Sequence, residues 1–287
     1  MQTIEFLKEY RWKANFVFAG ALMILCYRWM SDSLLSQMEQ PLFLFKERES
    51  AYLWLLSSGV PQWISSNTIA AVTFDSALFL FPMLFLLSQR RVFSVLFSIL
   101  LLFYFMTFNL VTGHHYHSLT GLIVITIPFW FRKEEKFHVA WELARYYLLY
   151  IFASAALWKI TRGSAFYEPQ LSEILKSQQL YLLIQQPDSL HARLVQYLIA
   201  NVQISHALLL ANVVLQLSFV VGFFTKRFDS ILFWLAILFC IANYLVMSIF
   251  SFELLILNLS LLDWKNSKMI IKSDLSGLRS QPVISNH

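Results

Sequence analysis

A lysine stands at the end of one of the most apolar stretches of this chain. Residues 151–163 (IFASAALWKITRG) pass from small and aromatic side chains directly into Lys159. A charge at the centre of a membrane helix costs about 2.5–3.5 kcal/mol and less near the boundary, so this amine requires an explanation. Either Lys159 anchors the helix by extending its ammonium to the membrane surface, or it is a functional amine that an apolar pocket deprotonates into a base.

Other polar residues fall on the same side of the membrane as Lys159 if successive apolar stretches cross it in alternate directions. They are Arg28, Asp75, His114, His115, His117, Arg162, His206 and Glu253. Ionisable groups within a membrane are functional candidates, because each must find a partner or line a wet cavity. The sequence therefore predicts a polar site in the outer half of the protein.

Each candidate also has a structural interpretation. Arg28 is the first choice as the partner of Asp75, since two buried charges neutralise each other with or without a substrate. The histidines of residues 113–123 (GHHYHSLTGLI) are expected near Lys159, or else form a wet interfacial turn. No acidic ligand adjoins them, so no metal site is predicted. His206 alone is explained by its place at a helix start.

Composition predicts an all-α, polytopic membrane protein. Of 287 residues 58% are hydrophobic, 17% are aromatic and 14% are charged, and the mean hydropathy is +0.59. A helix needs about 20 apolar residues to cross a bilayer. We expect seven or eight spans, near residues 15–30, 69–88, 92–111, 119–131, 144–158, 205–224, 229–248 and 250–262. The last two require a tight turn near residues 248–251. The short window 119–131 either borrows flanking polar residues to complete a span or sits inside the bundle.

The basic residues are distributed as topology signals along the chain, so its positive charge does not predict a nucleic-acid partner. With alternating crossings they concentrate on the side of the N-terminus, at residues 8–13, 90–91, 132–136, 226–227 and 265–279. This bias predicts a cytoplasmic N-terminus and an even number of spans. We expect one transmembrane domain over residues 1–264 and a basic cytoplasmic tail over residues 265–287, without a cleavable signal peptide.

Two segments on the outer side are longer than simple connections. Residues 47–67 carry several aromatic and aliphatic side chains among Ser, Gly and Pro. Residues 168–200 contain two helical patterns, and the second places Leu190, Leu194, Val195, Leu198 and Ile199 on one face. Such amphipathic helices lie along the membrane interface or cap the bundle. Here they form either a structural cap or a lid over a pocket open to lipid.

The stretch YYLLYIFASAALWKI, followed by an interfacial helix, and the element GHHYHSLTGLI together resemble the HTTM superfamily. This family shares the membrane domain of vitamin K-dependent gamma-glutamyl carboxylase, and Lys159 occupies the place of the lysine that ends one of its spans. The resemblance covers residues 10–262 and fits the short bacterial type, without the large lumenal domain. It implies the bacterial cytoplasmic membrane.

Three functions are expected from the residues and the resemblance together. The first is a membrane component that handles or matures a secreted or membrane-active peptide, with the lipid bilayer and a peptide or protein as partners. The second is a carboxylase-like redox or proton-transfer enzyme, in which Lys159 takes a proton from a reduced isoprenoid quinone or lipid while His115 or His117 relays protons. The third is an ion-coupled transporter using Arg28, Asp75 and Glu253. The residues expected to contact substrate are His114, Arg162, Asp75, Arg28, His206 and Glu253.

Overall fold

The computed structural model describes residues 2–38, 50–112, 117–249 and 251–262, and within them every regular element is a helix. This confirms the all-α class. The α-helices are α1 (Gln2–Met30), α2 (Ser50–Ser57), α3 (Val60–Ser66), α4 (Thr68–Ser88), α5 (Arg91–Thr112), α6 (His117–Thr126), α7 (Glu134–Thr161), α8 (Gln170–Gln178), α9 (Leu180–Gln185), α10 (Leu190–Ala200), α11 (Val202–Ser218), α12 (Asp229–Met247) and α13 (Phe252–Asn258). The 3-10 turns are η1 (Leu35–Gln37), η2 (Ile127–Trp130), η3 (Phe219–Phe223) and η4 (Leu259–Leu261).

Five segments of the described chain are long and apolar enough to cross a membrane. They are Ile4–Gln37, Thr68–Ser88, Arg91–Val111, Val202–Phe223 and Asp229–Met247. Two further apolar helices, Leu119–Trp130 and Phe252–Leu261, are shorter. Helix α7, with 28 residues, is about 42 Å long, but Arg145 and Lys159 make it more polar than the five. The membrane character of the chain is thus evident in its helices.

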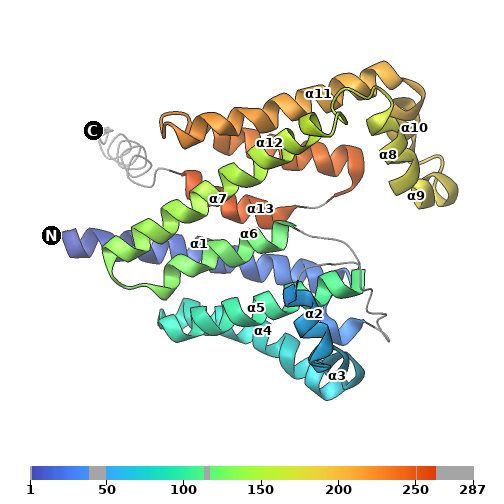
Figure 1. Cartoon of the computed structure of the whole chain (residues 1–287). Coiled ribbons are helices and arrows are strands. Elements are labelled where there is room, and N and C mark those ends of the chain that lie inside the picture. Colours follow the sequence, from blue (N-terminus) through green and yellow to red (C-terminus); the bar gives the residue numbers. More distant parts are fainter. Residues whose placement is uncertain (1, 39–49, 113–116, 250, 263–287) are drawn as a thin grey trace, which may run out of the picture.

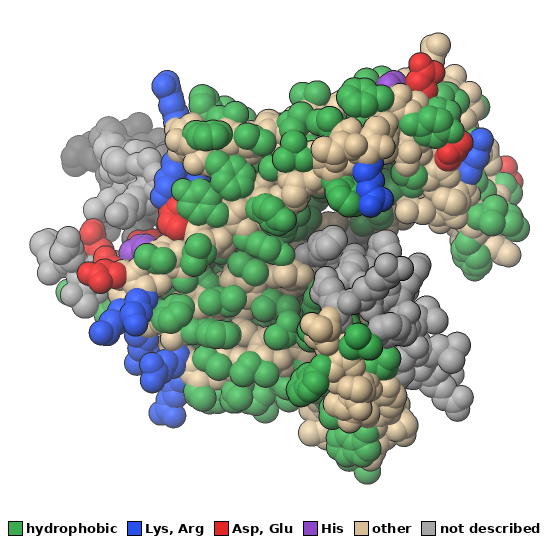
Figure 2. Space-filling model, in the orientation of Figure 1, with side chains coloured by type: hydrophobic (Ala, Val, Ile, Leu, Met, Phe, Trp, Pro, Cys, Tyr) green, Lys and Arg blue, Asp and Glu red, His purple; other side chains and the backbone are tan. Residues whose placement is uncertain are grey.

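The long helices run side by side, and successive ones point in opposite directions (Figure 1). Helix α4 packs against α1 and α5, α13 against α6, and α11 against α7. The small helices α2, α3 and α8–α10 gather at the end of the bundle away from the N-terminus, which we term the distal end (Figure 1). Hydrophobic side chains cover the middle of the visible face, whereas many basic ones lie at the N-terminal end (Figure 2).

An aromatic cluster holds the first half of the bundle together. Phe18 of α1 packs against Phe85 of α4 with ring centroids 4.1 Å apart, and against Phe129 of η2 at 5.4 Å. Such pairs contribute about 0.5–1.5 kcal/mol beyond the area they bury. The short segment α6–η2 is enclosed by its neighbours, because Leu119, Leu122 and Phe129 are fully buried. Of the two alternatives for this window, the structure thus favours a place inside the bundle.

The distal helices correct the predicted amphipathic face. Helix α10 forms over Leu190–Ala200, and Ser189 caps it by accepting a hydrogen bond from the Ala192 N–H. Val195 and Leu198 are buried as predicted, but Leu190 is 85% exposed and Leu194 39% exposed. The buried stripe instead begins at Ala192, because α8 packs on that side of α10.

The turn between α12 and α13 is as tight as the sequence required. Helix α12 ends at Met247, and Ser248 takes the left-handed conformation with φ 54°. Its N–H donates to the Tyr244 carbonyl, which satisfies one of the last free carbonyls of α12. The chain resumes as α13 at Phe252, so this segment returns from the distal end.

Candidate functional site

The Lys159 side chain points into the bundle. Its Nζ donates to the Gln216 Oε1 at 2.7 Å and lies 3.5 Å from the Ala155 carbonyl, one turn earlier on α7. Helical side chains lean toward the N-terminus of their helix, and α7 begins at the end of the bundle opposite to Lys159. The amine is therefore directed away from the distal surface. Lys159 does not have the geometry of a side chain that extends to the membrane surface to anchor its helix.

The partners of Lys159 are neutral. Gln216 lies on α11 and is 3% exposed, so its amide is buried inside the bundle. Within the described ranges no carboxylate forms an ion pair with Lys159. The Lys159 side chain is half-buried, and an anionic group placed beside its ammonium gains charge-assisted hydrogen bonds.

The other predicted neighbours of Lys159 do not join it. The Arg162 guanidinium stacks on the Trp158 ring at 3.8 Å and its side chain is exposed. His114 and His115 lie outside the described residues. His117 begins α6, but its side chain is also outside them. The expected proximity of a histidine to Lys159 therefore stays a prediction.

Arg28 pairs with Glu253, which corrects the predicted pairing with Asp75. The Arg28 Nη2 lies 2.7 Å from the Glu253 Oε1, and its Nη1 lies 3.3 Å from the Tyr104 hydroxyl. The guanidinium also lies 4.8 Å from the centre of the Phe108 ring. The prediction was wrong because α13 packs directly on α1, and so a carboxylate 225 positions away reaches Arg28 first.

Asp75 is held by backbone. Its Oδ2 accepts the Ser36 N–H at 2.7 Å, because η1 folds back against the start of α4. Its Oδ1 is buried and has no hydrogen-bond partner in the described part of the chain. Asp75 is 5% exposed, so the carboxylate lies inside the bundle.

The predicted residues form two separate groups. Arg28, Glu253 and Asp75 belong to the helices around α1, α4 and α13, whereas Lys159 belongs to α7 and α11. No hydrogen bond or ion pair between described residues joins the groups. His206, in the first turn of α11, joins neither, and its Nδ1 is buried without a partner among those residues.

Sequence reasoning missed the most completely paired charge of the structure. Arg145 donates from Nε and Nη2 to both oxygens of Asp229 at 2.7 Å, and from Nη2 to the Gly222 carbonyl at 2.8 Å. Arg145 lies inside an apolar stretch of the sequence, and this position could have identified it as a buried charge. This fork of three hydrogen bonds fastens α7 to the α11–α12 connection, so we assign it a structural role.

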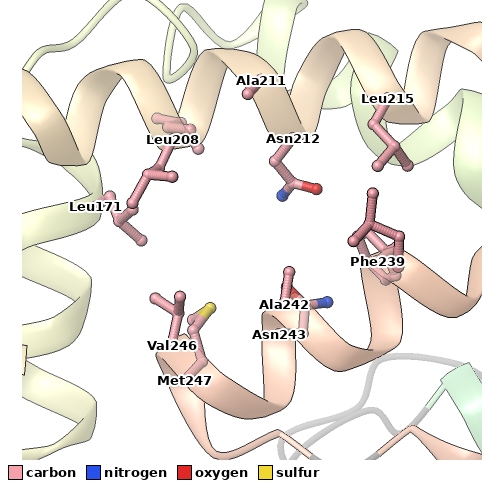
Figure 3. Close-up of a pocket in the computed structure, with 12 residues that line it drawn as sticks. Leu171, Leu208, Ala211, Asn212, Leu215, Phe239, Ala242, Asn243, Val246 and Met247 are labelled. Carbon is pink, nitrogen blue, oxygen red and sulfur yellow. The ribbon is translucent and has the colours of Figure 1, made fainter. Parts of the chain in front are cut away.

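A cavity also went unpredicted. It has a volume of about 260 Å³ and lies between α11 and α12, with Leu171 of α8 at one side. Asn212 and Leu208 reach into it from α11, and Asn243 faces them from α12 (Figure 3). Neither asparagine has a protein hydrogen-bond partner among the described residues. An amide left unpaired in an apolar medium costs about 2–7 kcal/mol.

This cavity is connected to Lys159 through α11. Asn212 and Gln216 are four residues apart, and residues so spaced are neighbours on a helix surface. Leu215, which precedes Gln216, lines the cavity. The α7–α11 pair thus presents an ammonium, and the α11–α12 pair presents two amides.

Comparison with known proteins assigns no family to this arrangement. No family model, curated protein or solved structure matches the chain. Its function is consequently argued from the geometry of Lys159 and of the cavity.

Proposed function

We propose that this chain is an integral membrane protein of the HTTM type that handles a secreted or membrane-active peptide in the outer half of its bundle. The observation that supports this most is the inward Lys159 ammonium, whose hydrogen-bond partners in the described part of the chain are neutral. An anionic group, such as a peptide carboxylate, would supply the missing counter-charge. Protein interiors rarely leave such a charge uncompensated without a functional reason.

The proposal includes a topology of eight crossings in a bacterial cytoplasmic membrane. Five long apolar segments, α7 and the two shorter apolar helices make up this number. Basic residues at the N-terminal end of the bundle favour a cytoplasmic location for that end. The distal end, with α2, α3 and α8–α10, is then the outer end, and α8–α10 lie along the outer interface.

A carboxylase-like enzyme is the second candidate, and the same lysine favours it. The Gln216 oxygen accepts a hydrogen bond from Lys159 but carries no negative charge. This contact therefore does not stabilise the protonated amine as a carboxylate would. The amine is free to serve as a base. The cofactor that the resemblance implies is a reduced isoprenoid quinone, but His115 and His117, expected beside it, lie outside the described side chains. The transporter alternative gains nothing, since Arg28 and Glu253 neutralise each other.

Two substitutions of Lys159 separate the candidates. If the ammonium receives an anionic peptide group, Lys159→Arg keeps most of the function and Lys159→Gln reduces it at least about tenfold, because one charge-assisted hydrogen bond is lost. If the amine is a base, Lys159→Arg abolishes function as well, since guanidinium does not deprotonate. The measurement is the amount of peptide that cells producing each variant release into the medium, determined by mass spectrometry.

Lys176→Gln is the matched control, because this lysine is exposed on α8 at the same end of the bundle. All variants are compared at equal amounts in the membrane fraction. Full activity of Lys159→Gln would contradict both candidates.

A further inference from the structure

In the proposed topology, the cavity between α11 and α12 opens toward the lipid. Both helices belong to segments of membrane-crossing length and composition. Leu238 lines the cavity and is nevertheless 54% exposed, and the neighbouring Trp234 and Ile241 of α12 are 67% and 51% exposed. A ligand therefore reaches this cavity laterally, from the hydrocarbon.

The walls of the cavity are apolar except for two carboxamides. Leu208, Val246 and Met247 lie at one side of the cavity, Leu215 and Phe239 lie at the other, and the two asparagines lie between them (Figure 3). Small residues, Ala211 on α11 and Ala242 on α12, leave space for the close approach of a backbone. The site is concave, mostly apolar and supplied with a few convergent polar groups, which is the usual character of a ligand pocket.

The chemistry of a carboxamide limits the ligand. Each amide carries donors on nitrogen and an acceptor on oxygen, and in hydrocarbon neither can be satisfied by water. An acyl chain offers no hydrogen bond, and an ester offers only acceptors. A peptide backbone offers N–H donors and C=O acceptors together, and an extended peptide in the membrane has the same unmet need.

We infer that the α11–α12 cavity binds a short extended stretch of hydrophobic peptide, whose backbone N–H and C=O groups pair with Asn212 and Asn243. This inference rests on the proposed peptide-handling function and assigns the place of the apolar part of the peptide. The leucine and methionine side chains of the cavity then contact the peptide side chains. Gln216 lies one turn along α11 from Asn212 and accepts a hydrogen bond from Lys159, so it lies between the bound peptide stretch and the ammonium.

The inference is tested on the full chain in lipid nanodiscs. The probe is a leucine pentapeptide, acetylated and N-methylamidated at its ends, with a photoreactive leucine at its centre. We expect saturable crosslinking to α11 and α12, located by mass spectrometry. Asn212→Ala and Asn243→Ala should each weaken binding by about tenfold, as the loss of one buried hydrogen bond requires. Methylating the backbone nitrogens of the peptide should weaken binding similarly.

The control is Gln203→Leu, which changes an exposed amide of α11 outside the cavity and should leave binding unchanged. Alanine adds no bulk, and the thermal unfolding midpoint of each variant verifies that it folds. Equal binding of the N-methylated peptide, equal binding by both alanine variants, or crosslinks away from α11 and α12 would overturn the inference. So would complete displacement of the peptide by an amide-linked lipid, which would be the occupant instead.

Failure here differs from failure of the proposed function. If the asparagine variants bind the probe normally while Lys159→Gln still loses peptide release, the cavity assignment alone is wrong. If the probe binds as expected but release is insensitive to Lys159, the proposed role of the ammonium is wrong.

Discussion

Single residues show how far local sequence determines a polar site. The apolar run before Lys159 was sufficient to single it out, because few residues tolerate that context without a reason. Its partner was not foreseeable, since Gln216 is 57 positions away. The same holds for Arg28, which was correctly identified as a buried charge but incorrectly paired. Sequence identifies a buried charge by its cost, whereas its partner depends on helix packing.

The Arg28–Glu253 pair leads to a prediction at this scale. Glu253→Leu should destabilise the protein by about 3–5 kcal/mol, because it leaves a buried guanidinium without its carboxylate. The double variant Arg28→Leu, Glu253→Leu should recover most of this loss, since neither charge then remains. Thermal unfolding in detergent measures the stability of the single and the double variant. Unfolding is detected as the loss of the monodisperse peak in size-exclusion chromatography after heating. A double variant no more stable than the single one would show that the pair does not account for the effect.

Close packing between elements determines the geometry around Arg145. Gly222 lies in η3, where an added Cβ would come 2.6 Å from the Leu149 Cδ2 and 2.9 Å from the Leu232 Cδ1. Its carbonyl also accepts a hydrogen bond from Arg145. The sequence indicates the helices by their apolar windows, but it does not indicate that one glycine sets the distance between α7 and α12.

Gly222→Ala should therefore destabilise the protein by about 1–3 kcal/mol through overpacking. Gly121→Ala is the comparison, and it should cost less, because its Cβ would meet the Leu257 Cδ2 only at 3.1 Å. Adding Leu149→Ala to Gly222→Ala should make room for the new methyl group, so the two effects should be less than additive. Thermal unfolding of Gly222→Ala, Leu149→Ala and the double variant, each compared with the unchanged protein, measures this coupling, and strict additivity would contradict it.

At the scale of the whole molecule, hydropathy and charge predicted most of the architecture. The helical class, the enclosed position of residues 119–131 and the turn at Ser248 all follow from the length of apolar runs and from turn chemistry. Length and composition identify five helices that are long and apolar enough to cross a membrane. The other three helices of the proposed topology carry charges or are short, so hydropathy along the sequence does not distinguish them from helices that do not cross.

The proposed orientation of these crossings is the last prediction. In a background with Cys26→Ala and Cys240→Ala, Ser189→Cys should react with a membrane-impermeant maleimide added to intact cells, because α10 starts at the outer face. Ser88→Cys, at the exposed end of α4 beside Arg90 and Arg91, should react only after the membrane is opened. In the proposed orientation, the basic pair keeps that end in the cytoplasm. The opposite labelling pattern would place Lys159 and the α11–α12 cavity toward the cytoplasmic face, and a secreted peptide would then have to be bound before it crosses.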